Sequence, residues 1–381
     1  MNRRPPRRII YLSGTRADFG LLRSTLLRIA TNKAMDLRVL VTGMHLSDAH
    51  GNTVDEIRDS GLSICAEVPL EMQSRSSGSM ALDIADCLTG VTGVLARERP
   101  DLLLVLGDRG EMLAGAIAAL HLGIPCVHLH GGERSGSVDE PVRHAISKLS
   151  SYHLVATEGS RRRLIAMGEE PSRIHVTGAP GLDGLAAAGA MERGDCLAAV
   201  GLASDARFIL SLFHPVVQQA AQARAQTEAL LQALQKVGLP VVWLEPNADA
   251  GSLEVRQALD HAAWLPGSRR VAHLPRTLFA AAMKHSEVLA GNSSAGIIEA
   301  ASFGTPVVNI GDRQRLRERN ANVMDAAAEP AAIERALRAA LQRGHAPCDN
   351  LWGDGRAGER IAGLMAQLPL GTAMLEKVNT F

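Results

Sequence analysis

The sequence predicts an α/β protein that consists of two doubly wound, Rossmann-like domains, each built around a parallel sheet. Short apolar runs rich in β-branched residues alternate with longer helical patterns along almost the whole chain. The runs are continuously apolar, as is typical of parallel strands that helices cover on both faces. With 381 residues and 46% hydrophobic content, the chain is long enough for two domains with a core each.

In the first domain, apolar runs lead into glycine or polar residues, as parallel strands of a doubly wound sheet do. We expect these strands at residues 8–14, 37–43, 102–107, 126–130, 153–157 and 174–178. Helical patterns separate them, and we expect helices at residues 18–31, 79–97, 111–122, 140–151 and 160–167. The first domain is therefore expected to span residues 1–180.

The second domain repeats this scheme after a cluster of Gly and Pro at residues 178–190. Its strands are expected at residues 208–213, 241–244, 287–290 and 306–310, and its helices at residues 219–237, 277–285, 295–302 and 331–342. We expect the domain to span residues 181–365 and a tail to follow at 366–381, with a last helix at about 358–367 that could cross back to the first domain. Two such domains that face each other leave a cleft at the carboxyl ends of their strands.

Composition excludes several classes of function. Lys plus Arg and Asp plus Glu number 40 each, which argues against broad binding to nucleic acid or to an anionic membrane. The five cysteines are scattered without a CxxC pair, so neither a zinc site nor a disulfide framework is indicated. No run approaches the roughly 18 apolar residues of a membrane span, and the apolar stretch near the N-terminus is too short for a secretory signal. We therefore expect a cytoplasmic protein.

Candidate site residues follow the predicted strands of the first domain. The first strand ends in SGTRADFG at residues 13–20, where a small-residue turn opens a helix. Such a turn offers backbone N–H groups to a phosphate, but Thr15 or Asp18 could equally cap the helix. The second strand leads into a segment that contains His45, and the third is followed directly by Asp108. An aspartate at that place either points into the cleft or caps the next helix.

The densest group of polar residues lies at positions 128–140, HLHGGERSGSVDE. Paired glycines let backbone approach a ligand, and titratable groups this close together shift one another's pKa values. His128 and His130 alternate on a strand, which leaves a zinc site open, although no third ligand has the right spacing. A polar loop with Asp139 as a helix cap is the plain structural alternative. If a helix begins near Asp139, Arg143 shares its face and His144 follows.

In the second domain, the strand ends carry His214, then Asn247 in the segment EPNAD, then GNSSAGIIEA at residues 291–300. The last segment reads as a diphosphate cradle, in which hydroxyls and helix-start amides meet phosphate oxygens. Glu299 stands one turn into the helix and could accept ribose hydroxyls; the alternative is a serine cap with an exposed or paired Glu299. A basic run at residues 313–319 could place one arginine at a phosphate.

Together these motifs resemble one family. SGTRADFG, HLHGGERSGSVDEPVRHAISKLS, LFHP, EPNAD, LPR, GNSSAGIIEA and SFGTPVVNIGDRQ, in this order over about residues 8–343, look like the UDP-N-acetylglucosamine 2-epimerase family. SGTRAD and GNSSAGIIEA look most like its hydrolysing, sialic-acid-pathway branch. The resemblance implies a two-domain GT-B fold, a UDP-sugar substrate, a homodimer and no cofactor.

The resemblance also implies roles for individual residues. Asp108 and Asp139 match positions credited with catalysis, and His214 matches a histidine near the diphosphate. Relatives often carry Glu where this chain has His130, so either His130 or Glu133 would take the acid/base role. The residues expected to bind substrate are Arg16, Asp18, His45, Arg143, His144, Asn247, Asn292, Ser293, Ser294, Gly296, Glu299 and, from the basic run, Arg319.

The reaction implied by the family is an elimination followed by a hydration. UDP leaves C1 as the C2 proton is removed, and water then adds to the 2-acetamidoglycal to give N-acetylmannosamine for nonulosonic acid synthesis. One alternative is the same reaction on UDP-N,N'-diacetylbacillosamine in the legionaminic acid pathway. Two others are a GT-B glycosyltransferase, which needs an acceptor, and a UDP-sugar sensor without catalysis. The elimination requires groups that stabilise the departing diphosphate and a carboxylate that accepts the proton.

Overall fold

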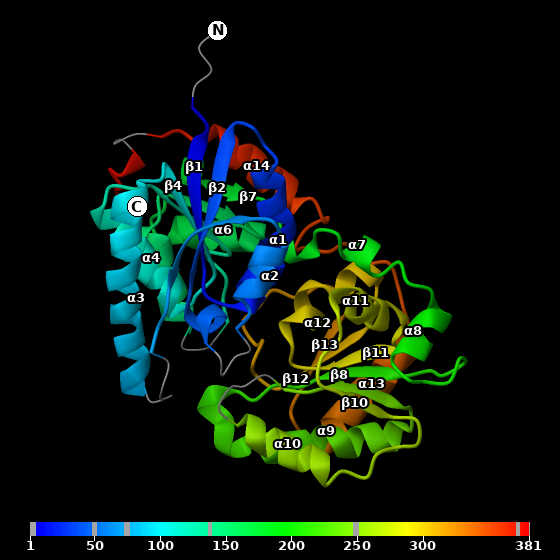
Figure 1. Cartoon of the computed structure of the whole chain (residues 1–381). Coiled ribbons are helices and arrows are strands. Elements are labelled where there is room, and N and C mark those ends of the chain that lie inside the picture. The colour runs from blue at the N-terminus through cyan, green and yellow to red at the C-terminus, as the bar shows by residue number, and fades with distance from the viewer. Residues whose placement is uncertain are drawn as a thin grey trace. The chain divides into compact units, whose positions relative to one another are not determined.

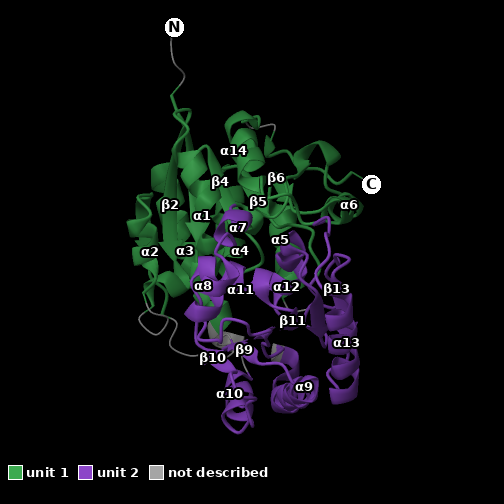
Figure 2. Ribbon diagram, turned by 90° about the vertical axis from the view of Figure 1, so that its right-hand side faces the viewer, with its two compact units in different colours: residues 1–134, 138–183, 352–381 green, residues 135–137, 184–351 purple. Residues whose placement is uncertain are grey.

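The chain divides into two compact units, which Figure 2 distinguishes by colour. Unit 1 consists of Met1–Arg134, Val138–Asp183 and Trp352–Phe381, and unit 2 consists of Ser135–Ser137 and Gly184–Leu351. The computed structural model describes residues 5–47, 52–71, 77–135, 139–246, 251–370 and 374–380.

Unit 1 is built on a parallel sheet of seven strands in the order β3-β2-β1-β4-β5-β6-β7. Its strands are β1 (Arg7–Ser13), β2 (Met35–Thr42), β3 (Ser63–Val68), β4 (Leu102–Leu106), β5 (Cys126–Leu129), β6 (Tyr152–Val155) and β7 (Ile174–Val176). The strand order reverses between β1 and β4. Ligands of doubly wound sheets bind at the carboxyl ends of the strands beside such a switch point.

Helices cover both faces of this sheet because successive residues of a strand point to opposite sides. Ile9 and Tyr11 of β1 belong to one hydrophobic cluster and Ile10 and Leu12 to another. Figure 1 shows α1 and α14 on one side of the sheet and α3 and α4 on the other. The helices of unit 1 are α1 (Arg16–Ala30), α2 (Val54–Asp59), α3 (Ser77–Glu98), α4 (Gly110–His121), α5 (Asp139–Leu149), α6 (Glu158–Ala166) and α14 (Ala357–Gln367).

Unit 2 has a parallel sheet of six strands in the order β10-β9-β8-β11-β12-β13, with its own switch point between β8 and β11. Its strands are β8 (Ile209–Leu212), β9 (Val241–Leu244), β10 (Arg269–Val271), β11 (Val288–Gly291), β12 (Val307–Ile310) and β13 (Val323–Ala326). Its helices are α7 (Leu185–Ala188), α8 (Arg193–Ala199), α9 (Ala223–Val237), α10 (Ser252–Asp260), α11 (Arg276–His285), α12 (Ser294–Ile298) and α13 (Pro330–Arg343). Separate apolar clusters fill the two faces, one with α9 and α13 and one with α8 and α11.

Each strand expected from the sequence is present, with ends that shift by a few residues. Strands β3, β10 and β13 and helices α2, α7, α8 and α10 were not expected from the sequence. These three strands lie at sheet edges, where half-exposed sequences such as SICAEV and RRV lack the continuous apolar run of a central strand.

The boundary after Asp183 agrees with the expected Gly- and Pro-rich junction, but the chain from Trp352 onward belongs to unit 1 rather than to the second domain. Asp183 explains this return, since its carboxylate accepts hydrogen bonds from the backbone N–H groups of Ala357 (2.9 Å) and Gly358 (2.6 Å) at the start of α14. The apolar face of α14, with Ile361 and Met365, then packs into the cluster that contains α1.

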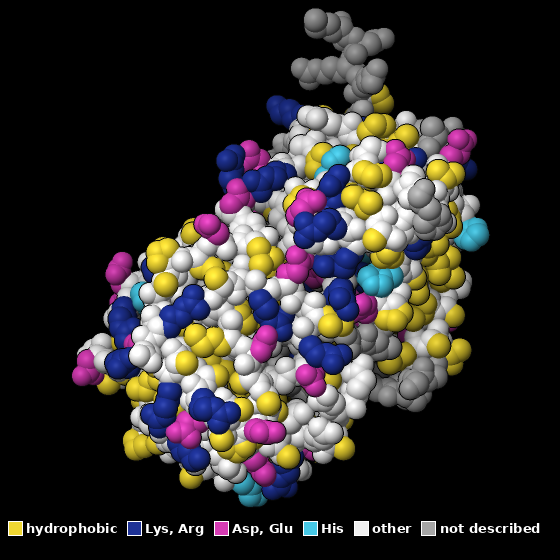
Figure 3. All heavy atoms as spheres, turned by 180° about the vertical axis from the view of Figure 1, so that it is seen from behind, with side chains coloured by type: hydrophobic (Ala, Val, Ile, Leu, Met, Phe, Trp, Pro, Cys, Tyr) yellow, Lys and Arg dark blue, Asp and Glu magenta, His cyan; other side chains and the backbone are white. Residues whose placement is uncertain are grey.

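Acidic and basic side chains are intermingled on the face of the molecule that Figure 3 shows. In the part of the chain that the structure describes, no helix is both long enough and apolar enough to cross a membrane.

Candidate active site

The turn between β1 and α1 is organised by Asp18. Thr15 is the N-cap of α1, and a reciprocal capping box joins it to Asp18. The Asp18 carboxylate accepts hydrogen bonds from the backbone N–H groups of Gly14 (3.0 Å) and Thr15 (2.7 Å) and from the Ser13 and Tyr11 hydroxyls. The sequence left open whether this turn binds a phosphate or caps the helix, and the structure shows the helix cap. The backbone N–H groups of Gly14 and Thr15, which were expected to meet a phosphate, donate to Asp18 instead. Arg16 is exposed beside this turn and pairs with Glu56 at 2.6 Å.

His45 continues this network. It is fully buried, with Nε2 at 3.0 Å from the Ser13 hydroxyl and Nδ1 at 2.9 Å from the Thr53 hydroxyl. Burial lowers the pKa of His45, against the attraction of Asp18, and burial raises the pKa of Asp18, against the hydrogen bonds from Ser13 and Tyr11. Since both ring nitrogens of His45 already have partners, we regard His45 and Asp18 as residues that shape the ends of β1 and β2.

An ion pair that the sequence analysis did not single out lies at the switch point of unit 1. Arg109 donates to Glu111 through Nε (3.2 Å) and Nη2 (3.1 Å), and Glu111 is buried. A Cβ at Gly43, where φ is +60°, would lie 2.7 Å from Glu111 Oε1, so only glycine fits there. Glu111 thus fills the space between the turns after β1 and β2 and holds Arg109 at the end of β4. The signal was present in GDRGE, where Asp108 alone was considered.

Asp108 follows β4 and receives a charge-assisted hydrogen bond from Arg143 Nη2. Arg143 lies on α5, is buried, and also donates through Nη1 to the Glu133 carbonyl at 3.1 Å. Asp139 is exposed at the first residue of α5. Asp139 and Arg143 both lie on α5, as expected from their spacing. Arg143 also pairs with Asp108, which is distant in the sequence. About a quarter of the Asp108 side chain stays exposed.

His130 and Glu133 form a pair in the loop that follows β5. The His130 Nδ1 atom is hydrogen-bonded to Glu133 Oε1, and both side chains are largely buried. His130 adopts a φ of +60°, a backbone conformation that is unusual for a residue with a side chain. Among the described residues, its Nε2 atom has no hydrogen-bond partner and is buried. The strained loop thus fixes the imidazole through one nitrogen and leaves the other for a further contact.

Both ring nitrogens of His128 have hydrogen-bond partners within the protein, which argues against His128 as a zinc ligand. Its Nε2 atom is 2.7 Å from the Gly107 carbonyl and its Nδ1 atom 3.1 Å from the Ser147 hydroxyl. Burial lowers the pKa of His128 to about 3, so the ring is neutral and both nitrogens are engaged. His144 is partly exposed on α5, near Glu140 at 3.7 Å, and burial lowers its pKa.

In unit 2, the residues after β8 and β11 are tied together. The Asn292 side chain donates to the His214 carbonyl and accepts from the His214 N–H, both at 2.7 Å. Asn292 is buried, and its own carbonyl accepts hydrogen bonds from Arg313 (3.2 Å) and Gln314 (3.1 Å). Asn292 therefore positions His214 and Arg313. Burial, and the charge of Arg313, lower the pKa of His214 to about 4, so this histidine is neutral near pH 7.

Arg313 and Arg319 of the basic run have different partners. Arg319 pairs with Asp325 of β13 at 3.2 Å and donates to the Arg317 carbonyl. Arg313 instead lies where its charge acts on His214. The sequence could not show which arginine lies beside Asn292, because seven consecutive residues with four arginines give no indication of which one faces the strand ends.

Ser293, Ser294 and Glu299 lie on one short segment. Ser293 is the N-cap of α12, with its hydroxyl 3.4 Å from the Ala295 N–H, and Ser294 begins the helix. Glu299 is buried and accepts a hydrogen bond from Arg276 at 2.9 Å; burial raises its pKa and Arg276 opposes the rise. Arg276, in the LPR motif, is an addition to the expected set. Asn247 lies outside the described residues.

Gly296 has a packing role. A Cβ at this position would lie 3.0 Å from Val307 and 3.1 Å from Leu289. The absence of a side chain therefore lets α12 pack closely on β11 and β12, which we consider its role in place of the expected substrate contact.

Comparison with known proteins identifies the family. Residues 27–366 match the sequence model of the family described as UDP-N-acetylglucosamine 2-epimerase. The chain belongs to this family. Its relatives include the UDP-N,N'-diacetylbacillosamine 2-epimerase (hydrolyzing) of Legionella pneumophila, 46% identical over 98% of this chain and 100% of that protein. The UDP-N-acetylglucosamine 2-epimerase of Neisseria meningitidis is 32% identical over 92% of this chain and 91% of that protein.

Solved structures of 2-epimerases share the fold. The Neisseria meningitidis UDP-GlcNAc 2-epimerase bound to UDP-GlcNAc superposes with a TM-score of 0.78 at 17% identity, covering 94% of this chain and 99% of that one. The Methanocaldococcus jannaschii enzyme in complex with UDP-GlcNAc and UDP gives a TM-score of 0.76 at 19% identity, with the same coverage. The predicted family and the predicted GT-B class of fold, two doubly wound parallel-sheet units, are confirmed.

Proposed function

We propose that this member of the 2-epimerase family is a bacterial cytoplasmic enzyme that eliminates UDP from UDP-N,N'-diacetylbacillosamine and hydrates the product with inversion at C2. The reaction class is supported by one arrangement above all, the Asp108 carboxylate held by buried Arg143 next to the loop of the His130–Glu133 pair. The choice of sugar is supported by the Legionella pneumophila relative, whose identity of 46% exceeds the 32% of the Neisseria meningitidis UDP-N-acetylglucosamine enzyme.

In this proposal, unit 2 holds the UDP group. The Ser293 and Ser294 hydroxyls and the Arg313 guanidinium bind the diphosphate, and Glu299 accepts the ribose hydroxyls. Neutral His214 donates a hydrogen bond to a phosphate oxygen and becomes more basic as the leaving group gains charge. These donors stabilise the diphosphate as it departs, which is the electrostatic requirement of the first step.

Unit 1 supplies the groups that act on the sugar ring. The C1–O bond breaks and its electron pair leaves with UDP, while the C2 proton passes to a carboxylate and a C1–C2 double bond forms. The C2 hydrogen has no neighbouring carbonyl to acidify it, so bond cleavage at C1 must run ahead of proton removal. Asp108 and Asp139 stabilise the positive charge at C1, and one of them takes the proton. General acid/base help of this kind contributes about 10²–10⁴-fold.

The hydration step needs a group that activates water and one that returns a proton to C2 on the opposite face. We assign proton exchange to His130 rather than to Glu133. Glu133 is bound to Nδ1 and orients the imidazole, so that Nε2 is the nitrogen with a free role. An imidazole can accept a proton at one nitrogen and donate it again, which suits a group that must do both.

The same reaction on UDP-N-acetylglucosamine, which gives N-acetylmannosamine, is the second candidate, and the Neisseria meningitidis relative favours it. Both products feed the synthesis of nonulosonic acids. The two sugars differ at C4 and C6, whereas the groups assigned here act on the nucleotide and on C1 and C2.

The proposal is tested by proton NMR of the purified protein in D2O with each UDP-sugar in turn. We expect free UDP and a free sugar that is inverted at C2 and carries deuterium there, formed faster from the diacetylbacillosamine donor. Faster turnover of UDP-N-acetylglucosamine would mean that this sugar nucleotide, and not the diacetylbacillosamine donor, is the preferred substrate. UDP release that depends on an added acceptor would indicate a glycosyltransferase, and binding of both donors without turnover would indicate a sensor.

A further inference from the structure

We propose that Lys377, far from the candidate site in the sequence, is a positioning residue that holds α5 so that Arg143 meets Asp108. The effect on catalysis rests on the proposed function, whereas the effect on α5 does not. Four observations support the proposal: the contacts of Lys377, the charges around it, the connection through α5 to Asp108, and the cavity beside the C-terminal segment.

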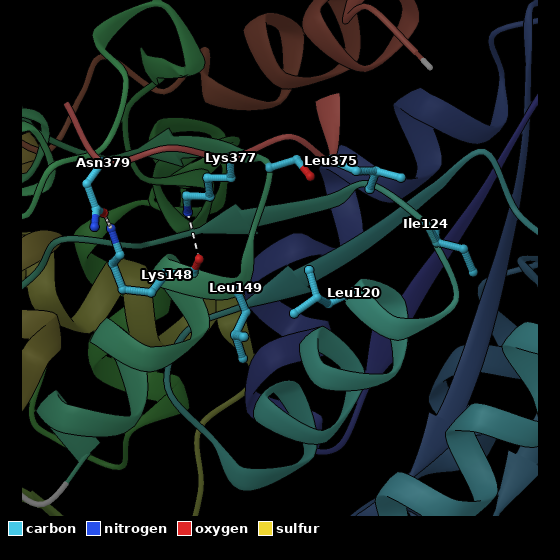
Figure 4. Close-up of a pocket in the computed structure, with 8 residues that line it drawn as sticks. Leu120, Ile124, Lys148, Leu149, Leu375, Lys377 and Asn379 are labelled. Atoms are coloured by element: carbon cyan, nitrogen blue, oxygen red, sulfur yellow. Dashed lines mark hydrogen bonds between the residues drawn. The ribbon is translucent and has the colours of Figure 1, made fainter. Parts of the chain in front are cut away.

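The Lys377 ammonium caps the C-terminal end of α5. Its Nζ atom lies 2.8 Å from each of three carbonyl oxygens, those of Ser147, Lys148 and Ser150. The last carbonyls of a helix lack partners within the helix and carry its partial negative charge, so a cation there is favourable. Figure 4 shows Lys377 reaching down to this end of the helix and Asn379 joined to Lys148. The segment Leu375–Thr380 is thereby fixed to α5.

A buried carboxylate strengthens this contact. Glu169 is 1% exposed, with Oε2 at 2.6 Å from Lys377 Nζ and Oε1 at 2.7 Å from Lys148 Nζ. Its Oε2 atom is also 2.8 Å from His153 Nε2. A buried anion is stable only with such partners, and removal of one partner leaves charge uncompensated. Lys377 is thus an integral member of a buried polar cluster.

The cluster connects through α5 to Asp108. The Ser147 hydroxyl donates to the Arg143 carbonyl at 3.1 Å and contacts His128 Nδ1 at 3.1 Å. His128 in turn holds the Gly107 carbonyl at 2.7 Å, directly before Asp108. From its other side, Asp108 is held by Arg143 itself. Helix α5 is therefore joined to the cluster at its C-terminal end and, one turn earlier at Arg143, to Asp108.

Apolar packing beside the C-terminal segment is incomplete. A cavity of about 270 Å³ remains there. It is lined by Leu120, Ile124, Lys148, Leu149, Ser151, Leu375, Lys377 and Asn379. Because the apolar side chains leave this volume unfilled, the polar contacts of Lys377 and Asn379 contribute to the attachment of the segment to α5.

The test compares Lys377→Met with Lys377→Arg in the full-length protein. Methionine keeps the length and removes the charge, and arginine keeps a cation that can donate to the same carbonyls, with the cavity to accommodate it. We expect Lys377→Met to lower kcat by about ten- to a hundredfold, because small misplacements of reacting groups cost factors of this size. KM and the affinity for UDP, which depend on unit 2, should stay unchanged, and Lys377→Arg should recover most of the lost kcat.

Two variants serve as controls. Val378→Ala alters an exposed neighbour in the same segment. Lys284→Met removes a lysine that donates to a carbonyl in unit 2, that of Gly189 at 3.0 Å. Both should keep the kcat of the wild type, even if Lys284→Met lowers the melting temperature.

A second readout separates this proposal from the proposed function. In Lys377→Met, amide hydrogen exchange across α5 should be faster than in the wild type, while exchange in α9 of unit 2 should not change. If the wild type turns over neither sugar, the proposed function fails and the exchange result still decides on the positioning of α5. Unchanged exchange in α5, or a kcat of Lys377→Met equal to that of the wild type in an active enzyme, would overturn the proposal.

Discussion

Arg143 Nη2 donates a hydrogen bond to Asp108 Oδ2, and this pair joins residues that are 35 positions apart in the chain. The guanidinium is buried, whereas the carboxylate is partly exposed. The arrangement holds the Asp108 carboxylate at the carboxyl end of β4 beside a buried guanidinium, with about a quarter of the side chain exposed.

Replacement of either carboxylate in unit 1 should abolish most turnover. We expect Asp108→Asn and Asp139→Asn each to lower kcat by at least about a hundredfold while UDP still binds, because the amide can neither accept the C2 proton nor stabilise charge at C1. Steady-state kinetics and calorimetry with UDP measure the two effects. Asp36→Asn, at a half-exposed position on β2, is a matched control that should behave as the wild type. Near-normal turnover in both catalytic variants would remove these carboxylates from the chemistry.

His130 and Glu133 should act as one unit. If Glu133 works only by orienting the imidazole, His130→Gln and Glu133→Gln each lower kcat, and the double variant loses no more than His130→Gln alone. A cycle of the four proteins, compared by kcat, measures this coupling. If the loss of kcat in the double variant equals the product of the losses in the two single variants, Glu133 has an independent role.

The affinity for a UDP-sugar should depend on pH through His214. The pKa of the free enzyme's His214 is about 4, and a bound diphosphate raises it, so the complex holds more protons than the free enzyme between the two pKa values. Affinity should therefore rise as pH falls through the pKa of the complex and level off below about 4. Calorimetry with the inactive Asp108→Asn variant in buffers of different ionisation heat should detect proton uptake. In a variant that also carries His214→Asn, the uptake should vanish.

Glu299 should recognise the ribose. We expect Glu299→Gln to weaken UDP binding by about ten- to a hundredfold, since hydrogen bonds to a charged group contribute about 1.5–3 kcal/mol. The matched ligand is 2'-deoxy-UDP, which lacks one of the hydroxyls. The variant should discriminate less between the two nucleotides than the wild type does, and equal discrimination would argue against this contact.

Glu169 should make stability depend on acid. Burial would raise its pKa, but hydrogen bonds from His153, Lys148 and Lys377 outweigh burial and lower it to about 2 from an ordinary value of 4.5. A depressed carboxyl pKa stabilises the folded state fully above the unfolded value, and the contribution is lost as pH falls through the folded value. The difference in Tm between wild type and Glu169→Gln should thus be largest near neutral pH and shrink from pH 4.5 toward 2. Glu376→Gln, at an exposed position, should show no such trend.

Much of the fold could be predicted because central parallel strands are continuously apolar. LLLVL of β4 is buried at every position, and the end of this strand locates Asp108 two residues later. Edge strands such as β10, with the sequence RRV, lack this signal. Each pairs with a single neighbouring strand, and its side chains are partly exposed to solvent.

The sequence could indicate the positions of the candidate site residues but not the partners of their side chains. Asp108, His130 and His214 follow strands and could be found from the sequence, whereas the pairing of Arg143 with Asp108 depends on how α5 packs. The role of Asp18 as a cap was recognised as an alternative, and only the hydrogen bonds decide it. Arg313 could not be separated from Arg319, nor Lys377 connected to α5, because side-chain contacts over such distances leave no periodic pattern.

The return of the chain to unit 1 has a consequence for synthesis on the ribosome. Residues of unit 2 from Gly184 to Leu351 are contiguous and can fold as they emerge, but unit 1 lacks α14 until translation has passed residue 367. Until then, the surface of α1 that Ile361 and Met365 cover is exposed to water. The first domain to be made is therefore the last to be finished, and a nascent chain stalled before α14 presents an apolar surface to chaperones.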